Sequence, residues 1–285
     1  MSACVDLAFS TNAYTKYGLD EAVRRITAHG YDGVELLCDD PHGYFPSFDA
    51  DDRRALLDAL DETGIAVSNV NANTATGYYD DAPPSAFFDP SIVTADEEER
   101  RWRVEYTKRA IDLADTVDSP AVSVATGRPL PGTPPAEAHE YLRESLHEIL
   151  DYAEPRGVDI GIEFEPGLLV GCTDEALDLI DDLGRSSLGI NLDLGHVAVD
   201  GEDLAETIRR SARHITGLHV EDVPGGRGGK HYHLVPGDGD LDFSAVFDAL
   251  AEVGYDGFAT VELYTYPDEP DAAARRSHEA LAEYV

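Results

Sequence analysis

Gly161-Ile-Glu-Phe-Glu-Pro166 is an apolar, strand-like stretch that ends in two carboxylates. Three later strand-like stretches also end on a side chain that can bind a metal. They are Asn191-Leu-Asp-Leu-Gly-His196, Gly217-Leu-His-Val-Glu-Asp222 and Thr260-Val-Glu-Leu-Tyr264. Four consecutive strands are therefore expected to present Glu163, Asp193, His219 and Glu262 at their carboxyl ends.

The rest of the chain repeats one unit, a short apolar run followed by a helix with apolar residues at helical spacing. Glycines separate helix from strand at Gly30, Gly64, Gly157 and Gly254. The segment Gly30-Tyr-Asp-Gly-Val-Glu-Leu36 is echoed by Gly254-Tyr-Asp-Gly-Phe-Ala-Thr-Val-Glu-Leu263. This repetition predicts a chain built from successive strand and helix pairs.

The expected strands cover residues 5–10, 33–37, 65–72, 121–127, 161–166, 188–196, 215–221 and 257–263. The expected helices cover residues 19–29, 48–63, 99–117, a segment ending at 154, 173–183, 202–213, 242–253 and 271–284. Thr173 is the expected N-cap of the fifth helix. Eight alternating pairs in 285 residues predict a single α/β domain over residues 1–285, a (β/α)8 TIM barrel rather than an open sheet. Catalytic groups of such barrels lie at the carboxyl ends of the strands.

The composition excludes some partners. The formal net charge is −36 and the isoelectric point is near 4.3, so the surface repels nucleic acid and anionic membranes. An acidic surface of this kind is typical of a halophilic protein in a salty cytoplasm. Cys4, Cys38 and Cys172 form no CxxC pair, and no targeting segment or long apolar run is visible. We expect a cytoplasmic protein with free thiols. A homo-oligomer is compatible with the sequence.

Glu163 and Glu165 share one face of their strand because side chains alternate, so either can be the first metal ligand. Buried carboxylates need a cation, a proton or arginine partners. We expect Glu163 to bind metal, with a structural ion pair as the alternative. For Glu165 we expect a substrate contact, a contact to another ligand or a solvated carboxylate. Carboxylates with one imidazole favour Mn²⁺, Co²⁺ or Mg²⁺.

Other polar residues have more than one interpretation. His196 is a candidate substrate contact, with a second metal or a loop role as alternatives. The glycine-rich segment 223–239 is expected to be mobile unless a ligand or metal orders it, and residues 224–239 are expected to form a lid or rim that orders over the substrate. It contains Arg227 and His233 as candidate substrate contacts, although His231 and His233 also fit a further metal or a purely polar loop. Glu35 is expected to support the site rather than bind the metal.

These motifs, together with His233-Leu-Val-Pro-Gly-Asp-Gly-Asp-Leu-Asp242, resemble the xylose isomerase-like TIM-barrel superfamily. They are most similar to sugar and sugar-phosphate isomerases and epimerases related to D-tagatose 3-epimerase. The resemblance implies a divalent metal on Glu163, Asp193, His219 and Glu262, with His196 contacting a small sugar or sugar phosphate. The ketose 3-epimerases of this superfamily also have a substrate-binding Glu after the first ligand and an Arg after the ligand His. Glu165 comes earlier, and Arg227 later, than in that pattern.

The chemistry fits this arrangement. A divalent cation that chelates a carbonyl and the adjacent hydroxyl stabilises an enediolate. Glu163 and Glu262 are the candidate catalytic acid and base, which exchange a proton on opposite faces for epimerisation. A shuttle between neighbouring carbons gives aldose–ketose isomerisation. The alternatives are an inosose-type dehydratase, an apurinic-site endonuclease and a non-catalytic sugar-binding barrel.

Overall fold

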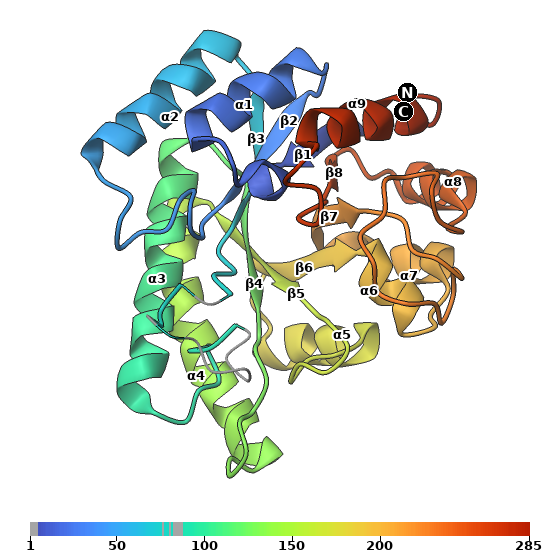
Figure 1. Ribbon diagram of the computed structural model, residues 1–285. Coiled ribbons are helices and arrows are strands. Elements are labelled where there is room, and N and C mark those ends of the chain that lie inside the picture. Colours follow the sequence, from blue (N-terminus) through green and yellow to red (C-terminus); the bar gives the residue numbers. More distant parts are fainter. Residues whose placement is uncertain (1–4, 76, 80, 82–87) are drawn as a thin grey trace.

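The computed structural model describes residues 5–75, 77–79, 81 and 88–285. Within these residues, eight parallel strands close into a barrel in sequence order (Figure 1). The strands are β1 (Asp6–Ser10), β2 (Gly33–Leu37), β3 (Ala66–Asn71), β4 (Ala121–Ala125), β5 (Asp159–Glu163), β6 (Leu188–Asp193), β7 (Ile215–Val220) and β8 (Phe258–Val261). The predicted (β/α)8 barrel is confirmed.

Helices surround the barrel and cover the outer face of its strands (Figure 1). They are α1 (Leu19–Ala28), α2 (Ala50–Thr63), α3 (Glu97–Thr116), α4 (Pro135–Ala153), α5 (Thr173–Leu183), α6 (Leu194–Val199), α7 (Leu204–Ser211), α8 (Phe243–Val253) and α9 (Pro270–Leu281). Short 3-10 helices occupy Thr11–Tyr14, Glu154–Arg156 and Ala212–His214. No helix in this described part of the chain is long and apolar enough to cross a membrane.

Local sequence signals set several helix ends. Asp49 caps α2 by accepting hydrogen bonds from the N–H groups of Asp51 and Asp52, and the Asp52 side chain bonds back to Asp49 N–H. Gly64 ends α2 with φ of 67°, a left-handed conformation that glycine adopts without steric cost. The prediction for α5 was wrong by one residue, since Cys172 is the N-cap and Thr173 is already helical.

The sixth strand is shorter than predicted. It ends at Asp193, and residues 194–196 belong to α6, which the apolar pattern had assigned to the strand. The physical reason is a cap: Asp193 Oδ1 accepts a hydrogen bond from His196 N–H at 2.7 Å and starts the helix. The fifth strand ends at Glu163, so Glu165 lies beyond it.

The pairing of β5 and its neighbours places the site inside the barrel. Ile160 and Ile162 are fully buried, while the alternate residues Gly161 and Glu163 face the interior. A Cβ on Gly161 would lie 2.6 Å from Thr216 Oγ1, so glycine permits this close approach. Asp193 pairs with His219 across β6 and β7. The ends of neighbouring strands therefore lie at one level of the barrel.

Arg103 of α3 organises the long connection from β3. Its buried guanidinium donates hydrogen bonds to the carbonyl oxygens of Ala72, Thr74, Phe88 and Pro90 at 2.6 to 3.3 Å. This connection covers residues 72–96. Its residues 76, 80 and 82–87 lie outside the described residues, as does Cys4. The other two cysteines are free thiols.

Candidate metal centre and substrate pocket

Four buried side chains meet at the carboxyl end of the barrel. Glu163 ends β5, Asp193 ends β6, His219 lies one residue before the end of β7, and Glu262 directly follows β8. None is more than 8% exposed. One ligand atom from each residue lies within 4.8 Å of the others. The barrel thus brings together the four candidate ligands named from the strand ends.

The ring of His219 has two different sides. Its Nδ1 lies 3.0 Å from Glu163 Oε1, and 3.8 Å from both Asp193 Oδ2 and Glu262 Oε2. Its Nε2 lies 2.7 Å from Glu35 Oε2, which is fully buried on β2. Burial alone lowers the pKa of His219, but Glu35, Glu262 and Glu163 outweigh it and raise the pKa well above its usual value. The distances show that Nδ1 faces the three carboxylates of the cluster, while Nε2 faces Glu35.

The two carboxylate oxygens of Asp193 have different roles. Oδ1 caps α6, whereas Oδ2 is buried and has no hydrogen-bond partner among the described residues. An unpartnered buried carboxylate oxygen is costly unless a cation or a proton compensates it. Three carboxylates and one imidazole around one point match the donor set of a hard divalent cation. The residues present therefore fit a metal.

Amide side chains from the first half of the barrel hold this cluster. Asn73 Nδ2 donates to Glu163 Oε2 at 2.8 Å, and Asn69 Nδ2 donates to Glu35 Oε2 at 2.7 Å. Because Glu35 contacts Nε2 of His219, it can orient the ring and fix its tautomer. Glu35 thus lies behind the cluster, on the side of His219 away from the three carboxylates.

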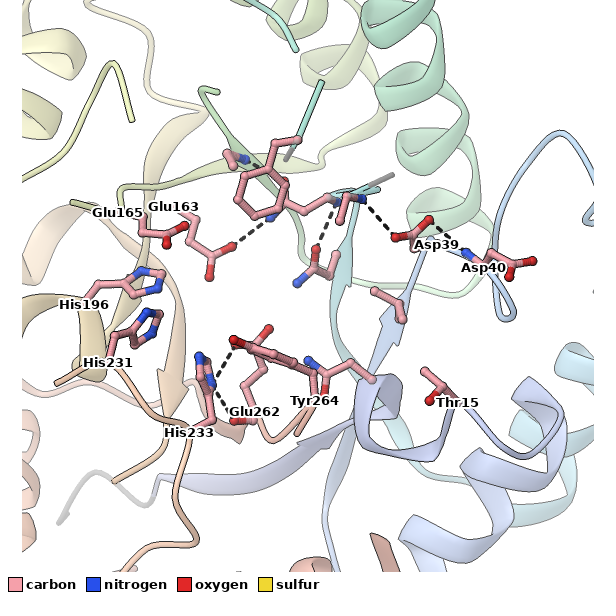
Figure 2. Close-up of a pocket in the computed structure, with 17 residues that line it drawn as sticks. Thr15, Asp39, Asp40, Glu163, Glu165, His196, His231, His233, Glu262 and Tyr264 are labelled. Carbon is pink, nitrogen blue, oxygen red and sulfur yellow. Dashed lines mark hydrogen bonds and ion pairs between the residues drawn. The ribbon is translucent and has the colours of Figure 1, made fainter. Parts of the chain in front are cut away.

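A pocket of about 330 Å³ opens over the cluster (Figure 2). Three residues of the predicted site, Glu165, His196 and His233, line it together with Glu163 and Glu262. The other lining residues are Asn12, Thr15, Leu37, Asp39, Asp40, Asn71, Asn73, Ala75, Phe88, Ala125, His231 and Tyr264. The volume suits one small molecule.

Glu165, His196 and His231 form a second group at one side of the pocket, with ligand atoms within 4.8 Å of one another (Figure 2). His196 Nδ1 lies 2.9 Å from the carbonyl oxygen of Phe164, an acceptor, so Nδ1 donates a hydrogen bond there and Nε2 is the ring nitrogen left for a ligand. Burial raises the pKa of Glu165. This side of the pocket offers an imidazole ring and a carboxyl group to a ligand.

His233 braces Glu262 from the loop after β7. Its Nδ1 donates to the Glu262 carbonyl at 3.1 Å and lies 3.6 Å from Glu262 Oε2. Burial lowers the pKa of His233 to about 4, so the ring is neutral at pH 7. Burial also raises the pKa of Glu262 well above its usual value, which favours its protonated form.

Arg227 lies outside the pocket. It is exposed and its Nε donates to the carbonyl of Gly201. The glycine-rich segment that carries it is fastened by Asp222, whose carboxylate accepts hydrogen bonds from the N–H groups of Val223, Gly237, Gly239 and Leu241 at 2.9 to 3.0 Å. Sequence reasoning gave Asp222 no role, although its place directly before a glycine-rich loop was a usable signal.

Glu221 is a second residue that sequence reasoning missed. It is fully buried, and it meets no donor among the described residues, although in its protonated form it can donate a hydrogen bond to the Asp193 carboxylate. Burial, followed by the proximity of Asp193, raises its pKa well above the usual range. A Cβ on Gly195 would lie 1.8 Å from Glu221 Oε1, so the glycine makes room for this carboxyl. The Asp-Leu-Gly-His spacing contained that signal.

Comparison with known proteins agrees with the barrel fold. A family model described as xylose isomerase-like TIM barrel matches residues 23–284. Fructoselysine 3-epimerase of Shigella flexneri is 25% identical over 276 residues, which cover 94% of each chain. Ketose 3-epimerase of Arthrobacter globiformis is 26% identical over 262 residues, covering 90% of this chain and 81% of the relative. A crystal structure of a D-tagatose 3-epimerase-like protein superimposes with a TM-score of 0.80 at 25% identity, covering 98% of this chain and 97% of the other.

Proposed function

Because the chain belongs to the xylose isomerase-like TIM-barrel family, we propose that it is a divalent-metal-dependent epimerase or isomerase of keto sugars. The observation that carries the proposal is the buried cluster of three carboxylates and one imidazole at the base of a pocket for one small molecule. The named relatives are ketose and fructoselysine epimerases, which supports the same reaction class.

Glu163, Asp193, His219 and Glu262 would hold the cation, with Mn²⁺, Co²⁺ or Mg²⁺ as the expected metals. When bound, it would supply Lewis-acid stabilisation of negative charge on the substrate carbonyl. Asp193 and His219 are then fixed as ligands by the α6 cap and by Glu35. Glu163 and Glu262 remain as groups that can also move protons.

Glu163 and Glu262 approach the cluster from β5 and from the end of β8. Asn73 fixes the Glu163 carboxylate, which can remove the proton next to the substrate carbonyl. Glu262, which approaches from β8, is placed to return a proton on the other face. His196 lines the pocket and bonds to Phe164 through Nδ1, which leaves Nε2 for a hydrogen bond with a substrate hydroxyl.

We infer a cytoplasmic, salt-adapted enzyme that acts on a small sugar and binds neither nucleic acid nor membranes. The net charge of −36 supports the exclusion of both polyanionic partners.

Turnover in D₂O tests the proposed reaction. The protein, stripped with chelator and reloaded with each metal, is assayed with a panel of ketoses, and bound metal is measured in every variant. We expect deuterium beside the carbonyl of the product, and a fall in kcat of at least about 10² in Glu163→Gln and Glu262→Gln.

Deuterium-free product together with active variants would exclude proton transfer by these carboxylates. Deuterium-free product with inactive variants would point to a hydride shift. Loss of water from the substrate would select the dehydratase alternative.

A further inference from the structure

We propose that Arg103 is a positioning residue for the proposed reaction: its buried guanidinium fixes the backbone on both sides of Asn73, and Asn73 in turn holds the carboxylate of Glu163. This role rests on the proposed function of Glu163 as the base that removes the proton next to the substrate carbonyl. The hydrogen bonds of Asn73, those of Arg103 and the path of the β3–α3 connection support it.

The Asn73 side chain bridges the carboxyl ends of β4 and β5. Its Oδ1 accepts a hydrogen bond from Ala125 N–H at 2.6 Å, and its Nδ2 donates to Glu163 Oε2 at 2.8 Å. A backbone N–H can only donate, so the atom that faces Ala125 is the amide oxygen, and the NH₂ group is left for the carboxylate. Glu163 Oε1 lies 3.0 Å from His219 Nδ1 in the cluster. Asn73 therefore sets the rotation of the Glu163 carboxylate beside the cluster.

Arg103 holds the peptide groups on both sides of Asn73. Its Nη1 donates to the carbonyl oxygen of Ala72 at 3.3 Å, and its Nη2 donates to that of Thr74 at 2.8 Å. The pairing of β3 with β2 and β4 ends at Asn71, two residues before Asn73. The guanidinium therefore fixes the backbone of Asn73 where strand pairing no longer does.

The same guanidinium also holds the far end of the connection. Its Nε donates to the Pro90 carbonyl at 2.6 Å, and its Nη2 donates to the Phe88 carbonyl at 3.2 Å. Phe88 lines the pocket with a φ of 63°, a left-handed conformation that is uncommon for a bulky residue and needs surrounding contacts to hold it. One side chain thus ties the start of the connection to its end, so a displacement of Asn73 would break hydrogen bonds at both.

The arrangement depends on the shape of an arginine side chain. Burial lowers the pKa of Arg103 to about 10, so the group is charged at pH 7. Asp39 and Asp89 act on it electrostatically, but its four hydrogen bonds all go to backbone carbonyl oxygens. A guanidinium offers five N–H donors in a fixed planar fork, whereas a lysine ammonium offers three donors from one atom. Lysine at this position would keep the charge but lose the fork that spans both ends.

Hydrogen exchange at the Ala125 amide tests the positioning without any substrate, because this N–H bonds to Asn73 Oδ1. Measured by NMR on the Mg²⁺-loaded protein, Arg103→Lys should raise the exchange rate at Ala125 by about 3- to 10-fold, as for the loss of one hydrogen bond. The matched control is Arg100→Lys on the same helix. Arg100 donates to the carbonyls of Thr94 and Ala95 in the same connection, and its variant should leave Ala125 unchanged.

A double-mutant cycle tests whether Arg103 acts through Asn73. Arg103→Lys should lower kcat by at least about 10-fold for the ketose that the wild type converts fastest, because misplacing a group by about 1 Å can cost about 10². In an Asn73→Ala background the same change should lower kcat by less than about 2-fold, since the side chain through which it acts is absent. Arg100→Lys should leave kcat unchanged in both backgrounds. Bound metal is measured in every variant, so that kcat is compared at equal occupancy.

Unchanged exchange at Ala125 in Arg103→Lys, or an equal loss of kcat with and without Asn73, would overturn the proposal. If the lysine variant does not fold, Arg103→Gln replaces it, because a neutral amide leaves no buried charge, and the same outcomes apply. If the wild type converts no ketose, the proposed reaction fails, while faster exchange at Ala125 still supports the positioning of Asn73. If Arg103→Lys turns over as fast as the wild type, the reaction stands and the positioning fails.

Discussion

The two halves of the barrel use polar side chains in different ways. Strands β5 to β8 bring three carboxylates and one imidazole to a single point. Strands β1 to β4 and their loops contribute amides and hydroxyls, such as Asn69, Asn73 and Ser123, which donate to or accept from neighbouring side chains. The candidate ligands therefore come from one half, while the other half supplies the groups that hold Glu163 and His219, namely Asn73 and Glu35.

Glu35 differs from the other polar residues of the first half that contact the cluster, because it is a carboxylate. It is a buried carboxylate of the first half, but it reaches across to His219 Nε2 and accepts a second hydrogen bond from Asn69. Its charge is compensated by the imidazole instead of by the proposed cation. The buried carboxylates around His219 are therefore compensated differently in the two halves, by the imidazole for Glu35 and by the proposed cation for Glu163, Asp193 and Glu262.

The largest expected effect comes from removing a candidate ligand. Asp193→Ala and His219→Ala should lose the metal. The loss of metal affinity should exceed the roughly 10- to 100-fold loss that is typical when a residue that only hydrogen-bonds to a ligand is changed. Asn71→Ala, a change in the pocket lining of the first half, should keep the metal. Elemental analysis after desalting measures the outcome. Full metal retention in both ligand variants would remove the distinction between the halves.

Glu35→Gln tests whether the first half tunes the second. Loss of the negative charge behind His219 should weaken metal binding by about 10- to 100-fold without unfolding the chain. Ser68→Ala is the control, because Ser68 is a buried barrel residue whose hydroxyl bonds to Thr260. Metal titration monitored by calorimetry gives both affinities. Equal affinities in the two variants would mean that Glu35 is only a packing residue.

Asp89 is a buried carboxylate of the first half with no hydrogen-bond partner among the described residues. Burial raises its pKa to about 6. Its folded pKa therefore exceeds the unfolded value of about 3.9, so its contribution to stability is complete below about pH 4 and is lost as the pH rises through about 6. Asp89→Asn should raise the free energy of unfolding by about 2 kcal/mol at pH 8.

The gain from Asp89→Asn should shrink as the pH falls to 5, where the wild-type carboxyl is largely protonated. Urea denaturation from pH 5 to 8 measures the trend. A gain that does not depend on pH would show that this carboxyl is not destabilised by its charge.

The smallest effect concerns the surface, which is acidic in both halves. Repulsion among the excess carboxylates opposes the compact state, and salt screens this repulsion. The Tm should therefore rise by roughly a few degrees with added KCl. The charge acts outside the barrel interior, so Asp89→Asn should show the same slope with salt as the wild type. A Tm that stays flat up to about 1 M KCl would show that local ion pairs balance the charge.

The strand ends could be predicted because their signal is local. Glu163 and Glu262 each close an apolar run, and closure of a parallel barrel sets all such ends at one rim. The positions of loop residues follow no such sequence pattern. Arg227 was a candidate substrate contact, yet its guanidinium bonds to Gly201 and lies outside the pocket, because the hydrogen bonds of Asp222 set the path of its loop.

The sequence by itself determined the alternation of strands and helices, the barrel, and the four polar strand ends, since side-chain periodicity and strand polarity are properties of the chain. Only the tertiary structure decided that Glu35 faces His219 across the barrel, that Asp193 shares its carboxylate between α6 and the cluster, and that Asp40 and Glu165 line one pocket. These contacts join residues up to 184 positions apart, and their geometry depends on how the whole barrel closes.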